Sequence, residues 1–144
     1  MIASLPYLIA GMHAAILIAY AISEAKHDAE QIALHRPINH ATELASRLTV
    51  AGLEAIGLMG LMWLCSHSWP STLSLIPIGW AAWVITFRLA LNDARGLALD
   101  YVSRSNRYDA AFMRIGEALD VNAGRLAYGA EGLVLVAGVL MLVL

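Results

Sequence analysis

Four long apolar segments divide the chain, and each of them also carries ionisable or polar side chains. The segments comprise residues 2–22, 48–65, 73–91 and 126–144. Each is close to the roughly 20 residues that an α-helix needs to cross a bilayer. Charged residues make up only 14% of the chain, whereas a soluble domain has about 25%. The sequence therefore predicts an all-α, polytopic membrane protein that forms a single domain of 144 residues.

The polar residues in and beyond these segments recur at helical spacing. In the first segment, spacings of seven, four, three and four residues place a polar set on one helical face: His13, Tyr20, Glu24, His27 and Gln31. The other three segments carry similar faces: His40, Glu43, Arg47 and Glu54; Arg88, Asn92 and Arg95; Arg114, Glu117, Tyr128 and Glu131. Scattered interfacial charge would not align in this way on all four helices. We therefore predict an up-down four-helix bundle with a polar core, extended beyond the membrane by the helices themselves.

The basic residues are distributed on one side of the predicted membrane. All 9 lysines and arginines lie in or beside the connections at residues 23–47 and 92–125, and the loop at residues 66–72 has none. By the positive-inside rule, both termini and this loop lie outside, and the two charged hairpins lie in the cytoplasm. The first segment lacks the basic region that begins a signal peptide, so we expect it to be retained as a span.

Four ionisable residues fall at similar depth within the predicted spans. His13, Glu54 and Glu131 each lie roughly 20 Å from the outer end of their helix, with Arg88 about one turn nearer the cytoplasm. A charge at this depth costs at least about 2.5 to 3.5 kcal/mol, so these side chains should face the interior and pair. We predict that at least one of the two carboxylates lies within ion-pair reach of the arginine or the histidine. The cluster is either a structural ion pair that fixes helix register or a proton, cation or metal site.

A second polar layer is predicted in the cytoplasmic half. Glu24-x-x-His27 and His40-x-x-Glu43 each place a carboxylate and an imidazole on one helical face, as di-metal four-helix bundles do. With carboxylates from the last helix, the candidate metal ligands are Glu24, His27, His40, Glu43, Glu117 and Asp120. Imidazole combined with carboxylate favours iron, manganese or zinc. The alternative is that arginines neutralise these carboxylates, for example Arg47 with Asp28, and that no metal binds.

Three functions remain open at this point. The first is a transition-metal-binding or redox membrane protein, and the second is an oligomer that conducts protons or cations. The third is a non-catalytic assembly subunit of a larger membrane complex. The lipid bilayer is the expected partner, together with further copies of the chain or other subunits. The net charge of −2 argues against nucleic acid as a partner.

Overall fold

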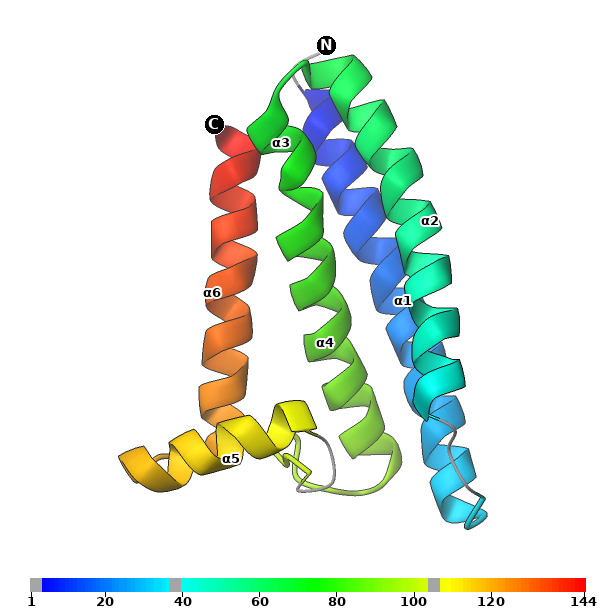
Figure 1. Cartoon of the computed structure of the whole chain (residues 1–144), viewed down its shortest axis with the longest axis vertical. Helices are drawn as coiled ribbons and strands as arrows, with labels where there is room; N and C mark the ends of the chain where they lie inside the picture. The colour runs from blue at the N-terminus through cyan, green and yellow to red at the C-terminus, as the bar shows by residue number, and fades with distance from the viewer. Residues whose placement is uncertain (1–3, 37–39, 104–106) are drawn as a thin grey trace.

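A computed structural model describes residues 4–36, 40–103 and 107–144 (Figure 1). The described chain forms six helices and no strand: α1 (Leu5–Ala33), α2 (His40–Ser66), α3 (Trp69–Leu73), α4 (Leu75–Ala94), α5 (Arg107–Leu119) and α6 (Ala123–Val143). Four stretches of the described residues are long and apolar enough to cross a membrane: Leu5–Ala33, Ala45–Ser66, Trp69–Ala94 and Ala123–Val143. The prediction of an all-α chain is confirmed.

Local sequence signals set the ends of several helices. Pro6 lies in the first turn of α1, where its missing N–H is not needed. Ser68 caps α3 by accepting from the backbone N–H of Ser71, and Asn122 caps α6 by accepting from the N–H of Arg125 at 2.9 Å. These side chains satisfy backbone donors that the first turn of a helix leaves without partners.

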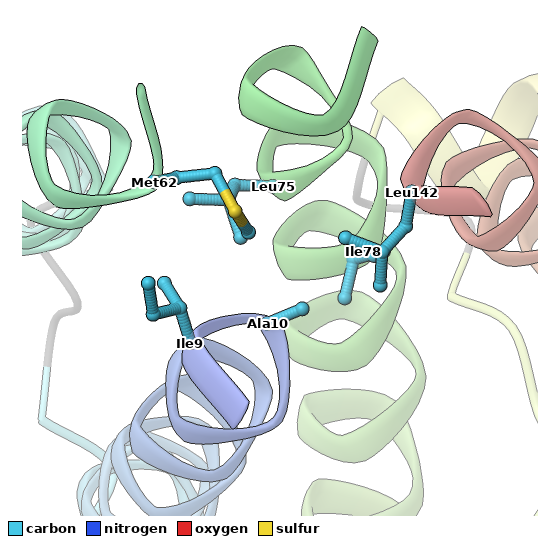
Figure 2. Close-up of a cluster of buried hydrophobic side chains, with 6 residues drawn as sticks. All are labelled: Ile9, Ala10, Met62, Leu75, Ile78 and Leu142. Atoms are coloured by element: carbon cyan, nitrogen blue, oxygen red, sulfur yellow. The ribbon is translucent and has the colours of Figure 1, made fainter. Parts of the chain in front are cut away.

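The helices α1 and α4 form the centre of the packing. α1 packs mainly on α4, α4 also packs on α6, and α2 packs on α1 and α3. Figure 1 shows α1, α2, α4 and α6 running lengthwise, with both chain ends near α3 at one end of the molecule. A buried apolar cluster lies toward that end and joins four helices (Figure 2): Ile9, Ala10, Met62, Leu75, Ile78 and Leu142.

The other end of the molecule differs from the sequence prediction. We expected residues 92–125 to extend the last two helices along the bundle axis, and this is wrong. α4 ends at Ala94, and Gly96 follows with a φ of 63°, a left-handed conformation that glycine adopts without steric cost. Asp120, with a φ of 53°, separates α5 from α6. As a result, α5 lies across the lower ends of α4 and α6 instead of continuing α6 (Figure 1).

Candidate functional site

A buried histidine joins three helices in the upper half of the molecule. The imidazole of His13 in α1 is 2% exposed. Its Nδ1 atom lies 2.9 and 2.8 Å from the two carboxylate oxygens of Glu54 in α2. Its Nε2 atom lies 3.0 Å from the carbonyl oxygen of Leu75 at the start of α4. A carbonyl oxygen can only accept a hydrogen bond, so Nε2 carries a proton and donates it to Leu75.

This arrangement leaves one proton between His13 and Glu54. If that proton is on Nδ1, the pair is an imidazolium and a carboxylate. If it is on the carboxyl group, the pair is a neutral imidazole and a carboxylic acid. Both forms have the same net charge of zero. Loss of the proton gives the pair a net negative charge and places the lone pair of Nδ1 against the carboxylate. The pair is therefore a one-proton site whose second ring nitrogen is fixed by the backbone.

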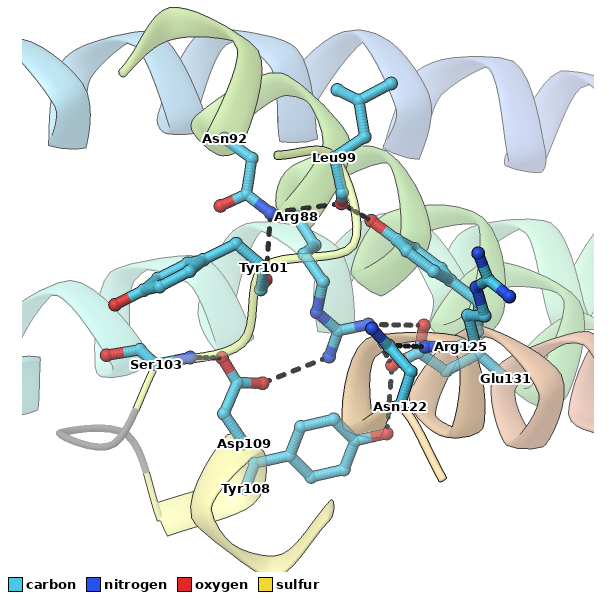
Figure 3. A network of polar contacts seen from close by, with 11 residues as sticks. Arg88, Asn92, Leu99, Tyr101, Ser103, Tyr108, Asp109, Asn122, Arg125 and Glu131 are labelled. Atoms are coloured by element: carbon cyan, nitrogen blue, oxygen red, sulfur yellow. Dashed lines mark hydrogen bonds and ion pairs between the residues drawn. The ribbon is translucent and has the colours of Figure 1, made fainter. Parts of the chain in front are cut away.

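A second polar cluster surrounds Arg88 of α4 (Figure 3). The Nη1 atom of Arg88 donates to both carboxylate oxygens of Glu131 in α6, each at 2.8 Å. Its Nη2 atom donates to Asp109 of α5 at 3.1 Å. The hydroxyl of Tyr108 donates to Glu131 at 3.2 Å, and the ring of Tyr128 lies 5.2 Å from the guanidinium carbon. One arginine thus faces two carboxylates, which gives these three side chains a formal net charge of −1 when both acids are ionised.

The same region fastens the connection between α4 and α5. Asn92 donates to the carbonyl oxygens of Leu99 and Tyr101 at 3.1 and 2.9 Å. The Tyr128 hydroxyl also donates to Leu99, at 2.6 Å. The second carboxylate oxygen of Asp109 accepts from the backbone N–H of Ser103 at 2.9 Å. These bonds satisfy the polar backbone of an irregular segment and hold the beginning of α5 beside Arg88.

The four residues predicted to form the intramembrane cluster are therefore found as two pairs. His13 contacts Glu54 between α1 and α2, and Arg88 contacts Glu131 between α4 and α6. Both carboxylates lie within ion-pair distance of a basic partner. Asp109, the second partner of Arg88, was not among the predicted site residues, because residue 109 was expected on a coaxial extension of the last span. The only signal for it was an acid near the start of a helix that follows polar turn residues.

Arg47 occupies the centre of the predicted metal layer. It donates to Glu24 at 2.6 Å and to Asp28 at 2.7 Å, and it lies 3.5 Å from Glu43. Its guanidinium group also stacks on the ring of Phe87, at 5.2 Å. The ion pair predicted between Arg47 and Asp28 is present. Two of the six candidate ligands, Glu24 and Glu43, are thus already engaged with a guanidinium group.

The other candidate ligands lie elsewhere. His27 is exposed on α1, and the side chain of His40 lies outside the described residues. Glu117 and Asp120 are exposed on and directly after α5, which packs against α6. The expectation that Glu117 or Asp120 completes a cluster with α1 and α2 stays a prediction. No group of three His, Cys, Asp or Glu side chains that could hold a metal ion occurs among the described residues. Binding of iron, manganese or zinc stays a prediction.

Comparisons with known proteins give no relative for this chain: no family model, curated protein or solved structure matches it.

Proposed function

We propose that this chain is an integral membrane protein that conducts protons, with the His13–Glu54 pair as the site where a proton is bound and released. Its α2 and α6 helices support membrane insertion, because large apolar side chains on their outer faces are mostly exposed. Leu53 and Ile56 of α2 are 69% and 70% exposed, and Leu133 of α6 is 72% exposed. Acyl chains would cover these faces. The distribution of basic residues supports an orientation with both termini outside.

The observation that carries the proposal is the fixed geometry of His13. Because α1 begins at Leu5, His13 lies eight residues, or roughly 12 Å, from that helix end, nearer than the roughly 20 Å expected from the sequence. At this depth a charge is costly, and the His13–Glu54 pair avoids a net charge by sharing one proton. Leu75 keeps the ring oriented, so that a proton leaves or enters only at the Nδ1–carboxylate side. The Glu54 side chain is 16% exposed and that of His13 2%, which makes the carboxylate the more accessible end of the pair.

The Arg88–Glu131 pair is less suited to this role. A guanidinium group stays protonated under all ordinary conditions. Arg88 therefore gives Glu131 a permanent counter-charge and acts in helix packing. The transition-metal or redox function predicted from the sequence has no assembled ligand set among the described side chains. The assembly-subunit function is the competing outcome of the experiment that follows.

Proton flux into vesicles tests the proposal. Protein reconstituted in lipid vesicles containing a trapped pH dye is given a potassium diffusion potential with valinomycin. Vesicles with wild-type protein should acidify faster than protein-free vesicles. Vesicles with Glu54→Gln, which lacks the acid, should acidify no faster than protein-free vesicles. Asp93→Asn is the matched control. It changes an exposed acid near the end of α4 and should behave as wild type. Wild-type flux no faster than in empty vesicles would support the assembly function instead, provided that circular dichroism shows folded protein.

Cysteine labelling tests the proposed orientation. In a Cys65→Ser background, His67→Cys lies in the loop between α2 and α3, and Leu34→Cys lies after the end of α1. Both native side chains are exposed. An impermeant maleimide added to intact cells should label the first position, and the second only after lysis. Labelling of Leu34→Cys in intact cells would contradict the orientation.

A further inference from the structure

The helix α5 carries a continuous apolar stripe that packs only in part on the rest of the chain. Its members are separated by four, three and four residues and fall within about 60° of one line along the helix: Tyr108, Phe112, Ile115 and Leu119. Tyr108 is 38% exposed, Ile115 47% and Leu119 61%. Tyr108 and Phe112 contact each other edge to face, with ring centroids 5.1 Å apart. The stripe is thus an ordered apolar surface, and its side chains become more exposed toward the end of α5.

A different face of α5 holds it to the protein. Asp109 is buried and bonded to Arg88 and to the backbone of Ser103. Gly116 is also buried, and a Cβ atom there would lie 2.8 Å from the carbonyl oxygen of Val121. At roughly 100° per residue, these two residues lie about 80° from the middle of the apolar stripe. Packing against the protein therefore fixes the rotation of α5 and leaves most of the stripe uncovered.

The side of α5 away from the stripe is polar. Arg114 and Glu117 lie there, about 130° and 170° from the middle of the stripe, and both are exposed. A helix with an apolar stripe, a polar opposite side and a basic residue is the pattern of helices that lie in the plane of a membrane interface.

The place of α5 in the fold matches such a position. Figure 1 shows α5 lying crosswise at the lower ends of α4 and α6, whereas α3 and both termini are at the other end. The candidate span of α6 begins at Ala123, four residues after α5 ends at Leu119. The stripe is therefore next to the point where the exposed apolar surface of α6 begins, and one bilayer can cover both surfaces.

We propose that α5 is an interfacial helix that lies in the headgroup region of the bilayer crossed by the spans. Its stripe is buried at the acyl-chain boundary, and Arg114 faces the lipid phosphates. This inference rests on the membrane insertion proposed above, but not on proton conduction. Its occupant is lipid, and a protein partner covering the same stripe is an outcome of the test.

Spin-label accessibility tests the inference. The full-length protein, in a Cys65→Ser background, is labelled at single cysteines and reconstituted in vesicles of phosphatidylcholine and phosphatidylglycerol. Ile115→Cys and Leu119→Cys report on the stripe, and Arg114→Cys and Glu117→Cys report on the opposite side. Leu133→Cys, on the exposed face of α6, reports on membrane insertion itself. Power saturation with oxygen, which concentrates in lipid, and with an aqueous nickel chelate gives the accessibility of each site.

The expected result is a higher oxygen-to-nickel ratio at both stripe positions than at the two opposite positions. Leu133→Cys should give the highest ratio. If Leu133→Cys is lipid-exposed but the ratios on the two sides of α5 are equal, the interfacial position is wrong while membrane insertion stands. Stripe labels that are shielded from both oxygen and nickel indicate coverage by a second protein chain and also refute the lipid proposal. If Leu133→Cys itself is exposed to nickel, membrane insertion fails and the inference fails with it.

Discussion

Removing Arg88 should destabilise the protein much more than removing the charge of its partner Glu131. Arg88→Met leaves two carboxylates, those of Glu131 and Asp109, without a basic partner, and the Glu131 side chain is 1% exposed. Breaking a buried ion pair from one side costs about 3 to 5 kcal/mol, because the remaining charge is left uncompensated. We expect a loss of this size in the free energy of unfolding.

The change Glu131→Gln has a smaller effect for two reasons. The amide oxygen of glutamine still accepts hydrogen bonds from Arg88 and Tyr108, so the loss is the difference between a charged and a neutral hydrogen bond, about 1 kcal/mol. In addition, Arg88 and Asp109 then form a pair of equal and opposite charge, which removes the surplus negative charge of the cluster. The expected loss is therefore about 1 kcal/mol or less.

Unfolding of the detergent-solubilised protein by sodium dodecyl sulfate, followed by circular dichroism, measures both losses. Arg125→Met is the matched control, because this arginine is 84% exposed and lies 4.0 Å from Asp100. Its effect should stay within about 0.5 kcal/mol. Equal losses of unfolding free energy for Arg88→Met and Glu131→Gln, or a larger loss for Glu131→Gln, would refute the surplus negative charge assigned to the cluster.

Three further predictions concern packing, ionisation and metal content. Gly79→Ala should lower the free energy of unfolding by about 1 to 3 kcal/mol, because its Cβ atom would collide with the His13 ring and approach Leu17 Cδ1 to 2.7 Å. Gly129→Ala, with nothing within 4 Å, should be neutral or stabilising. Burial and the Glu131 carboxylate raise the pKa of Tyr108. The contribution of Tyr108 to the free energy of unfolding is thus present below the ordinary tyrosine pKa of about 10, and it is lost as the pH rises through the higher pKa of Tyr108 in the folded protein. In ultraviolet titrations, the component that Tyr108→Phe removes should ionise later than that of free tyrosine, and a midpoint at or below the ordinary value would contradict this. If the candidate ligands around Glu24 and His27 bind iron, manganese or zinc, protein purified without chelator should contain one of these metals, and His27→Ala should contain less. Metal-free wild-type protein would end this hypothesis.

Helical periodicity was sufficient to predict the long apolar helices and the burial of His13, Arg88 and Glu131. A carboxylate deep in an apolar segment requires a partner, which makes contacts such as His13–Glu54 and Arg88–Glu131 foreseeable. The break after α4 was not foreseeable in the same way. It depends on the left-handed Gly96 and on the bonds from Asn92 to the backbone of Leu99 and Tyr101, which form only in the assembled fold.

The register of the predicted metal layer could not be predicted for a related reason. Glu24 and Glu43, from neighbouring helices, lie at the same guanidinium group of Arg47. The sequence indicated that arginines could neutralise these carboxylates, but not that one arginine reaches both, nor that a separate helix, α5, carries Glu117. Spacing along one helix determines on which helical face each side chain lies. The axial register between helices and the direction of the next helix depend on long-range packing.

The two ionic pairs of the spans also differ in when they can form. The chain is synthesised from its N-terminus, so His13 and Glu54 are both available once α2 has been made. Arg88 is made before either Asp109 or Glu131, both of which come from later helices. A nascent chain that has completed α4 therefore holds an unneutralised arginine until α5 and α6 follow. In the membrane-inserted state proposed above, insertion of α4 should be reversible until that moment, and arrival of Glu131 should commit the C-terminal half to the bilayer.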